Sequence, residues 1–354
     1  MLINALIEKN DKMKKKVLFI MNPISGTNKK DSIPEEIDKY IDKKLFDYQI
    51  AVTEHAGHAI ALTQKAVADK IDIVVAVGGD GTVNEVGQGL INSETAMGII
   101  PSGSGNGLAR HLCIPINIQK SLEIINQNVI HALDYGIINN HPFFCTCGMG
   151  FDAFISMKFA EAGKRGPITY VQKVLEEGLR YEPETYEIED DEGVHHYKAF
   201  LVSVANASQY GNNAYIAPQA HMSDGMLDVI IMEPFNVLEA PKVAIQMFNK
   251  TLDKDTKIKS FKAKSIHIHR KKKGVIHFDG DPIMADKDVE IKLVPKGIKV
   301  VVNPADCSEI RRPNVIQTSF SELFSYIDLI RLNVHKQSRK FQALNKIIFR
   351  KLNM

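Results

Sequence analysis

The chain has 354 residues and a formal net charge of +2, with 44% hydrophobic and 24% charged residues. This composition is typical of a folded globular protein and excludes a disordered chain. The near-neutral charge gives no reason to expect a nucleic acid as a partner. Of the four cysteines only Cys145 and Cys147 lie close together, and no second pair completes a zinc-binding pattern. We therefore expect free thiols in a reducing compartment.

Length and hydropathy limit the architecture and the location of the protein. A chain of this length is expected to form two domains. No apolar run approaches the ~20 residues of a membrane-spanning helix, and residues 1–16 contain no apolar core long enough for a signal peptide. We expect a cytoplasmic protein whose contact with a membrane, if it has one, is peripheral.

Apolar runs alternate with helical patterns in the N-terminal part of the chain. Strands are predicted at 17–21, 48–52, 71–77 and 96–100, and helices at 34–46, 58–70 and 83–91. Such alternation predicts a three-layer α/β domain with a parallel sheet covered on both faces. Ligands of these sheets bind at the carboxyl ends of the strands, so functional residues are expected in the loops that follow them.

From about residue 134 the pattern changes to short, often alternating segments with turn residues between them, which is typical of an antiparallel β domain. A helical stretch at 153–180 interrupts it. The predicted strands lie at 200–206, 226–232, 265–270, 274–278 and 289–293. We divide the chain into an N-terminal extension (1–15), an α/β domain (16–133), a β-rich domain (134–307) and a basic amphipathic tail (308–354).

A glycine-rich loop, Gly78-Gly-Asp-Gly-Thr82, directly follows the third strand and precedes a helix predicted to begin near Val83. Glycines let backbone N–H groups approach a phosphate, and the positive end of the helix dipole adds to this attraction. Asp80 would repel a phosphate unless a metal bridged them, which points to a Mg²⁺-nucleotide site. The alternative is a tight strand-to-helix turn in which Asp80 caps the helix.

The loops after the other three strands are also polar and rich in small residues. They comprise 22–26 after the first strand, 53–58 after the second and Pro101-Ser-Gly-Ser-Gly-Asn-Gly107 after the fourth. Because parallel strands present their carboxyl ends at one edge of the sheet, all four loops are expected to meet there. This convergence predicts a phosphate-rich ligand.

In combination, these and later segments resemble the ordered motifs of the diacylglycerol kinase catalytic-domain family, which includes bacterial lipid kinases and sphingosine kinases. The resemblance covers roughly residues 16–303, although Gly-Gly-Asp-Gly-Thr alone is shared with NAD kinases and phosphofructokinases. The segments that carry it are Asn22-Pro-x-Ser-Gly26, Thr53-x-x-x-Gly-His58, Gly78-Gly-Asp-Gly-Thr-Val-Asn-Glu85, Pro101-Ser-Gly-Ser-Gly-Asn106, Tyr210-Gly-x-x-x-x-Ile216-Ala-Pro218, Ser223-Asp-Gly-Met-Leu-Asp228 and Phe278-Asp-Gly-Asp281.

The resemblance implies a nucleotide domain followed by a β-sandwich-like domain, with ATP and Mg²⁺ in the cleft between them and a lipid hydroxyl as the acceptor. Two departures from the family pattern bear on the lipid more than on the reaction. Asp281 replaces the usual Glu, and residues 104–107 are similar to the sphingosine kinase variant. The residues implied in ATP binding are Asn22, Ser25, Thr53, Gly79, Asp80, Gly81, Thr82, Asn84, Glu85, Ser104, Gly105 and Asn106.

A second acidic segment ends the alternating strand at 275–279 and turns at Gly280. An acid in this place could take the proton of an attacking hydroxyl, whereas Asp-Gly is also a common pair in a plain hairpin turn. The resemblance favours catalysis by Asp279, Asp281 and Asp80. It leaves open which of the first two is the base, since Asp279 could organise water and metal while Asp281 takes the proton.

The turn at 223–228 is also acidic. The resemblance implies a structural Mg²⁺ there, bound by His221, Asp224 and Met226, and the alternative is an ordinary solvated turn. His55 and His58 are spaced like metal ligands, but no third ligand completes the pattern. We therefore expect these two histidines at the nucleotide rim.

Basic segments are candidate contacts with a membrane. They are Lys164-Arg165, Lys271-Lys-Lys273, which is predicted to form a hairpin tip, and the tail from Arg331, where basic and apolar residues alternate. A basic amphipathic helix of this kind could lie on an anionic membrane surface. It could equally pack on the α/β domain or on a second subunit, which would make the protein a homodimer.

The sequence therefore predicts an ATP- and Mg²⁺-dependent lipid kinase that transfers the γ-phosphate of ATP to a lipid hydroxyl of the diacylglycerol or sphingoid type. The alternatives are an NAD kinase-like enzyme with a soluble acceptor, a catalytically inactive protein that binds lipid or nucleotide, and a membrane-surface scaffold. The continuation Val83-Asn84-Glu85 argues against the first alternative. The intact acids Asp80, Asp279 and Asp281 argue against the second.

Overall fold

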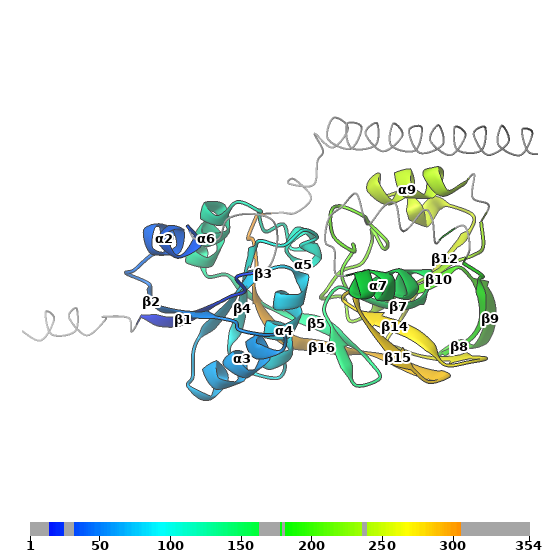
Figure 1. Cartoon of the computed structure of the whole chain (residues 1–354), viewed down its shortest axis with the longest axis horizontal. Coiled ribbons are helices and arrows are strands. Elements are labelled where there is room, and N and C mark those ends of the chain that lie inside the picture. The colour runs from blue at the N-terminus through cyan, green and yellow to red at the C-terminus, as the bar shows by residue number, and fades with distance from the viewer. Residues whose placement is uncertain (1–13, 25–31, 163–177, 179–180, 236–238, 306–354) are drawn as a thin grey trace, which may run out of the picture. The chain divides into compact units, whose positions relative to one another are not determined.

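The computed structural model describes residues 14–24, 32–162, 178, 181–235 and 239–305 (Figure 1). The chain divides into two compact units, Met1–Pro304 and Ala305–Met354. Apart from Ala305, the second unit lies outside the described residues, and so do Ser25, Lys164 and Arg165. None of the described helices is long and apolar enough to cross a membrane.

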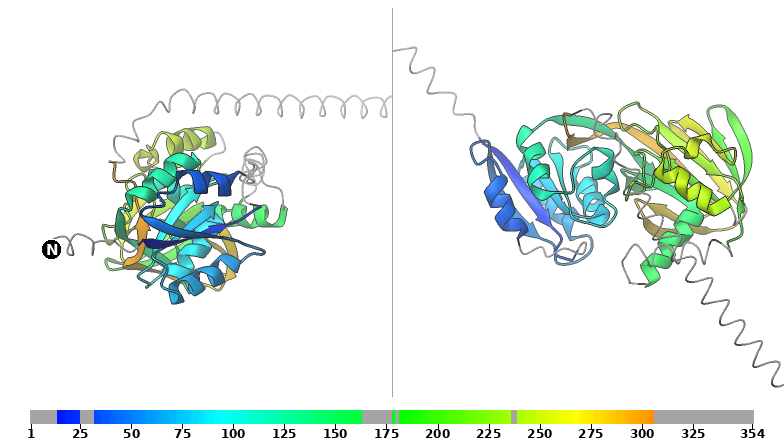
Figure 2. Two further views of the ribbon diagram at one scale, coloured as in Figure 1. Left: turned by 90° about the vertical axis from the view of Figure 1, so that its left-hand side faces the viewer. Right: turned by 90° about the horizontal axis from the view of Figure 1, so that it is seen from above.

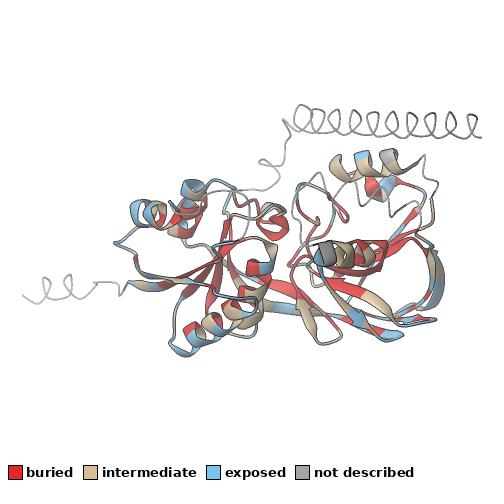
Figure 3. Ribbon diagram, in the orientation of Figure 1, coloured by how far each residue is buried: buried red, intermediate tan, exposed pale blue. Residues whose placement is uncertain are grey.

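The N-terminal part of the first unit is a parallel sheet with helices on both faces. Its elements are β1 (Lys15–Met21), α2 (Ile33–Tyr40), β2 (Phe46–Val52), α3 (His58–Ala68), β3 (Ile73–Gly78), α4 (Asp80–Leu90), β4 (Ala96–Pro101), α5 (Gly107–His111) and α6 (Ile118–Gln127). The strands run parallel in the order β2-β1-β3-β4. Helices α2 and α6 pack together on one face and α3 and α4 on the other (Figure 2). β3 and β4 are consequently buried along their whole length (Figure 3).

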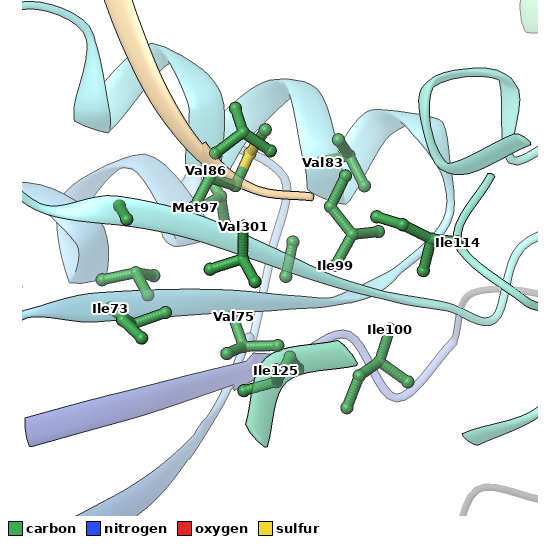
Figure 4. Close-up of a cluster of buried hydrophobic side chains, with 14 of the residues drawn as sticks. Ile73, Val75, Val83, Val86, Met97, Ile99, Ile100, Ile114, Ile125 and Val301 are labelled. Carbon is green, nitrogen blue, oxygen red and sulfur yellow. The ribbon is translucent and has the colours of Figure 1, made fainter. Parts of the chain in front are cut away.

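Apolar side chains from the strands and from α4 fill the core of this sheet. Val83 and Val86 of α4 belong to the same buried cluster as Met97 and Ile99 of β4 (Figure 4). Removing such side chains from water is the main force that holds a helix on a sheet. This packing fixes α4 on the sheet, and it therefore fixes the position of the first turn of α4 at the end of β3.

The helix α4 begins earlier than the sequence predicted. It starts at Asp80 rather than near Val83, because Gly79 has an extended backbone and occupies the N-cap position. Gly81 and Thr82 therefore lie in the first helical turn instead of in a loop. The alternative in which Asp80 caps the helix is wrong for the same reason.

The helix predicted at 34–46 is shorter than expected. It ends at Tyr40, where Ile41 changes to an extended conformation, and Phe46 already begins β2. The four predicted strands of this part are found at matching positions in the parallel sheet.

The parallel sheet continues into the C-terminal part of the unit through two long strands, β5 (Ile130–Ile138) and β16 (Asp288–Val301). β16 pairs in parallel with β4 through Val300 and Met97, and it pairs in antiparallel fashion with β5. β5 spans residue 133, where the sequence analysis placed the end of the α/β domain. One sheet is therefore shared by the two predicted domains.

The C-terminal part is a two-layer β structure with helices on its outer face. It adds β6 (His141–Phe143), β7 (Thr146–Gly150), α7 (Phe151–Ala162), β8 (Glu184–Asp190), β9 (Gly193–Ala199), β10 (Leu201–Ala205), β11 (Leu227–Met232), α9 (Ala240–Phe248), β12 (Ile258–Ala263), β13 (Ser265–Arg270), β14 (Gly274–Phe278) and β15 (Asp281–Ala285). Within the described residues, β16-β13-β8-β9 complete a ten-stranded sheet, and β12-β11-β10-β7-β14-β15 form a second, antiparallel one. A buried apolar cluster between the sheets confirms the predicted β-sandwich-like domain. Side chains of α7 and α9 pack with the other face of the second sheet.

The sequence analysis predicted that Lys271–Lys273 form the tip of a hairpin, and this prediction is wrong. It connects β13 to β14, and these strands belong to different sheets. The guanidinium of the buried Arg270 holds this connection, because it donates hydrogen bonds to the carbonyl oxygens of Gly274 and Ala285. Alternation on both sides of a polar segment does not reveal whether two strands pair with each other.

A partly buried ion pair ties α9 to the loop that precedes β12. The Asp255 carboxylate lies 2.7 Å from Lys242 Nζ and accepts a 2.9 Å hydrogen bond from the Lys257 N–H. Lys242 and this N–H lower the pKa of Asp255 to about 2. The pKa in the folded chain is thus below that in the unfolded chain. The pair therefore stabilises the fold above about pH 4 and loses this effect as the pH falls toward 2.

We expect Asp255→Asn to lower the melting temperature at neutral pH, and the difference from the unmodified chain to shrink between about pH 4 and pH 2. Thermal unfolding followed by circular dichroism at several pH values measures this difference. Asp191→Asn, at the exposed end of the β8–β9 hairpin, is the matched control and should show no such trend. A difference in melting temperature that stays constant between about pH 4 and pH 2 would show that the charge of Asp255 does not stabilise the fold.

Candidate active site

The two glycine-rich loops touch each other backbone to backbone. A Cβ atom on Gly79 would lie 3.0 Å from the Cα atom of Gly103, and one on Gly103 would lie 2.3 Å from the Cα atom of Gly79. Glycine at both positions therefore allows the loops after β3 and β4 to approach this closely. Among the described residues, no atom beyond its chain neighbours and its own helix lies within 4 Å of the place where a Cβ of Gly81 would be, so none of them covers the first turn of α4 on that side.

Asp80 binds the second glycine-rich loop to the first. Its Oδ2 accepts a hydrogen bond from the Asn106 N–H (2.8 Å), and its Oδ1 accepts one from the Gly107 N–H (2.6 Å). The Asn106 side chain in turn bonds to both the N–H and the carbonyl oxygen of Gly103. Burial raises the pKa of Asp80, and the N–H donors offset part of this rise. Asp80 thus orders the loop, while its oxygens keep lone pairs beyond these two bonds.

Glu85 acts in the same way on the loop after β2. Its Oε1 accepts a hydrogen bond from the Gly57 N–H (2.8 Å), and its Oε2 accepts one from the Ala59 N–H (3.1 Å) at the start of α3. His55 and His58 stack in this loop with ring centroids 4.9 Å apart. Glu85 therefore supports the rim of the sheet, and its predicted contact with ATP stays a prediction.

The ends of β1 and β2 complete this rim. Asn22 Nδ2 donates a 3.2 Å hydrogen bond to Thr82 Oγ1 in the first turn of α4. The Thr53 N–H donates a 2.9 Å hydrogen bond to the carbonyl oxygen of Met21. The loops after all four strands thus lie at the carboxyl edge of the parallel sheet. Ser104, in the loop after β4, is exposed.

The carboxylate of Asp279 connects α4 to the β-rich part of the chain. Four groups among the described residues donate hydrogen bonds to it. Oδ2 accepts from Asn84 Nδ2 and from the Phe144 N–H, both at 2.8 Å. Oδ1 accepts from the N–H groups of Cys145 (2.7 Å) and Thr146 (3.1 Å). Burial raises the pKa of Asp279, and these donors offset part of the rise.

The turn between β14 and β15 is a two-residue hairpin turn. Asp279 and Gly280 both have positive φ angles, 48° and 89°, which this type of turn requires. Asp281 begins β15 directly after the turn and is exposed. The Asp-Gly pair is therefore a hairpin turn, as the plain interpretation proposed. This turn, Phe278–Asp281, is called the acid turn below, and it places Asp279 against α4, with Asp281 two residues further along the chain.

The predicted metal residues lie in the turn before β11. Asp224 Oδ1 accepts a 3.0 Å hydrogen bond from the Met226 N–H, and Asp224 Oδ2 lies 2.9 Å from Lys262 Nζ. The same ammonium lies 2.8 Å from Asp228 Oδ2, and the His221 ring bonds to the neighbouring serine hydroxyl. Among the residues the structure describes, no group of three or more His, Cys, Asp or Glu side chains is arranged to hold a metal.

The lysine ammonium already supplies a cation between the two carboxylates of this turn. A divalent metal bound to Asp224 would be repelled by that charge. Lys262 therefore holds this turn in the described structure, and the experiment at the end of this subsection tests the Mg²⁺ that the sequence analysis predicted at His221, Asp224 and Met226.

Several residues of this region were missed by the sequence analysis. Arg110 Nε donates a 3.1 Å hydrogen bond to the carbonyl oxygen of Gly105 in the second glycine-rich loop. Asp152, Tyr210 and His277 form a hydrogen-bonded group beside the acid turn. Asp152 follows a Gly-Met-Gly-Phe stretch after a strand, which is a weak signal, and His277 occupies an ordinary alternating position.

Both parts of the chain match known protein families. The model of the diacylglycerol kinase catalytic domain matches residues 16–138, and that of the YegS C-terminal NAD kinase beta sandwich-like domain matches residues 146–302. Together they span the parallel sheet, the acid turn and the sandwich. The chain belongs to the diacylglycerol kinase catalytic-domain family.

Individual relatives agree with this family. The chain is 28% identical to the diacylglycerol kinase of Bacillus subtilis (strain 168) over 273 residues, which cover 75% of this chain and 90% of that protein. It is 28% identical to a diacylglycerol kinase of Staphylococcus aureus over 274 residues, covering 76% and 87%. A crystal structure of a candidate diacylglycerol kinase from Bacillus anthracis aligns with a TM-score of 0.66 at 26% identity, covering 83% of this chain and 99% of that one. Family and relatives support a kinase.

We expect the turn around Asp224 to be held without a divalent cation. EDTA should leave the melting temperature unchanged, whereas Lys262→Met should lower it, because the buried Asp228 loses its partner at a cost of about 1–3 kcal/mol. Scanning fluorimetry with and without EDTA measures both effects. Lys264→Met, at a nearby exposed position, is the matched control. A melting temperature that falls with EDTA and recovers with Mg²⁺ would instead place a metal at this turn.

Proposed function

We propose that the chain is an ATP- and Mg²⁺-dependent lipid kinase, which transfers the γ-phosphate of ATP to the hydroxyl group of a lipid of the diacylglycerol or sphingoid type. One observation carries the proposal. The 2.8 Å hydrogen bond from Asn84 to Asp279 holds the acid turn against α4, whose first turn contains Asp80 and Gly81. Asp80 and Asn84 are about one helical turn apart, roughly 6 Å. A phosphate at the start of α4 and a hydroxyl at the acid turn would therefore be neighbours.

The start of α4 supports the binding of the phosphates. The first N–H groups of a helix have no partner within the helix, and the helix dipole is positive at this end. No described residue covers this turn at Gly81, and the close contact of Gly79 with Gly103 brings the backbone of a second loop to the same place. Arg110, bonded to the carbonyl of Gly105, adds a positive charge beside that loop.

We propose that Asp281 is the base and that Asp279 holds the turn in its conformation. The carboxylate of Asp279 is engaged by its four donors, whereas Asp281 lies exposed at the start of β15. In the reaction, the lipid hydroxyl oxygen forms a bond to the γ-phosphorus, and the bond from that phosphorus to the bridging oxygen of ADP breaks. The hydroxyl proton passes to the Asp281 carboxylate.

Mg²⁺ would accompany the ATP. Carboxylate oxygens are among the ligands that Mg²⁺ prefers, and Asp80, which keeps lone pairs beyond its two backbone bonds, is the residue that would hold it. When bound, the ion neutralises negative charge on the transferred phosphate.

A lipid acceptor also requires access to a membrane. Peripheral binding to an anionic surface, and the alternative of a homodimer, were both predicted from the tail at 308–354, which lies outside the described residues. Both stay predictions. The proposed reaction itself requires only that the acid turn reaches a hydroxyl at the level of the lipid headgroups.

Transfer of label from γ-labelled ATP to a panel of lipid micelles tests the proposal. We expect label in one class of lipid and none when Mg²⁺ is withheld. Asp281→Asn should lower kcat about 10²- to 10⁴-fold and leave the KM for ATP nearly unchanged, because it removes the proton acceptor and keeps the loops intact. Asp286→Asn, at the far end of the same hairpin, is the matched control and should retain activity.

The alternatives give different results in the same assay. Transfer to NAD and to no lipid would show an NAD kinase-like enzyme, and ATP binding without transfer to any acceptor would show a binding protein. Full kcat in Asp281→Asn would contradict its role as base and leave Asp279 as the remaining acid of the turn.

A further inference from the structure

We infer that Asp152 is a positioning residue, at the centre of a partly buried series of hydrogen bonds that sets the acid turn relative to the second glycine-rich loop. These hydrogen bonds run from the Tyr210 side chain through that of Asp152 to that of His277. The inference rests on the proposed function, because it concerns how the two halves of that site are aligned.

The centre of this chain is a carboxylate oxygen shared by two donors. Asp152 Oδ2 accepts a 3.1 Å hydrogen bond from the Tyr210 hydroxyl and a 3.1 Å hydrogen bond from His277 Nε2. The His277 side chain is only 2% exposed. A Cβ atom at position 148 would lie 2.7 Å from Asp152 Oδ2 and 3.2 Å from His277 Nε2, so Gly148 leaves the room that this pair occupies.

One end of this series of hydrogen bonds, at His277, reaches the acid turn. His277 lies on β14, on the side of the strand opposite to Ile276 and Phe278, which face the sandwich core. Its Nδ1 accepts a hydrogen bond from the Gly280 N–H at 3.4 Å, which places the ring proton on Nε2, facing Asp152. The peptide between Asp279 and Gly280 is thereby oriented by the histidine. The proposed base, Asp281, is the residue that follows Gly280.

The other end of this series of hydrogen bonds, at Tyr210, contacts the second glycine-rich loop. A Cβ on Gly107 would lie 3.3 Å from the carbonyl atoms of Tyr210 and from the Gly211 nitrogen. The Asn212 N–H donates a 3.0 Å hydrogen bond to the carbonyl oxygen of Gly105. The backbone around Tyr210 is therefore packed directly on the loop that Asp80 holds.

The site is consequently tied together at two places. The bond from Asn84 to Asp279 links the first loop and its helix to the turn, and the chain through Asp152 links the second loop to the same turn. If only the second link is lost, the donors of Asp279 keep the hairpin folded. The peptide between Asp279 and Gly280 can then change its orientation, and the distance between the Asp281 carboxylate and the phosphate changes with it.

Tyr210→Phe tests this inference because it removes one hydroxyl group and little else. We expect kcat on the accepted lipid to fall about ten- to a hundredfold, as for a displacement of reacting groups by about 1 Å, with the KM for ATP changed less than about twofold. Asp152→Asn keeps an oxygen acceptor in a side chain of the same size, so its kcat should fall less than that of Asp152→Ala. Tyr197→Phe, on β9 in the ten-stranded sheet and not in the sheet that contains β14, is the matched control.

A second measurement is independent of kinase activity. In protein labelled with ¹⁵N at glycine, the amide signal of Gly280 should shift in Tyr210→Phe and stay in place in Tyr197→Phe. A double-mutant cycle that combines Tyr210→Phe with His277→Gln should show non-additive losses in kcat, since both residues act through Asp152.

The outcomes separate the inference from the proposed function. Wild-type kcat and an unmoved Gly280 signal in Tyr210→Phe, with only a lower melting temperature, would show that the three residues merely fill the core and would overturn the inference. If no acceptor is phosphorylated at all, the proposed function fails and the positioning role fails with it, whereas the Gly280 signal still decides whether the turn and the loop are coupled.

Discussion

The carboxylate of Asp279 is the interaction on which the rest of this site depends. Its donors come from α4 and from the segment that leads into β7, so a single side chain joins the phosphate loop, the acid turn and the second sheet. A carboxylate removed from water is costly unless its oxygens are bonded. Asp279 meets this requirement with Asn84 and three backbone N–H groups. Any change that leaves these groups unbonded would therefore disturb both parts of the site.

Acidic side chains play the same part elsewhere in the rim. Asp80 bonds to the backbone of the loop after β4, and Glu85 bonds to the start of α3. Both accept hydrogen bonds from backbone N–H groups of these loops, so the protein's own side chains order the loops. Such preorganisation suits a phosphoryl transfer enzyme, in which positioning and electrostatic stabilisation supply most of the catalysis. A glycine-rich loop with an acid in it is thus understood as a scaffold as well as a ligand site.

Part of the fold was predictable because its signals are local. The four parallel strands, the polar loops that follow them and the Asp-Gly turn each occupy a few consecutive residues. The errors arose where the outcome depended on distant partners. The segment at 271–273 joins two sheets, and no local pattern distinguishes such a connection from a hairpin. The contact of Asp224 with Lys262 was likewise not predicted, because Lys262 lies on a neighbouring strand and far along the chain.

The sequence by itself determined that four polar loops meet at one rim, since parallel strands present their loops at one edge of the sheet and only glycine permits the contact between Gly79 and Gly103. It also determined that acids stand at a hairpin turn. Only the tertiary structure decided what those acids touch. The donors of Asp279, and the partners that Asp152 finds in Tyr210 and His277, come from strands and loops widely separated in the chain. Their meeting follows from the packing of two sheets around a shared core, which no spacing within the sequence records.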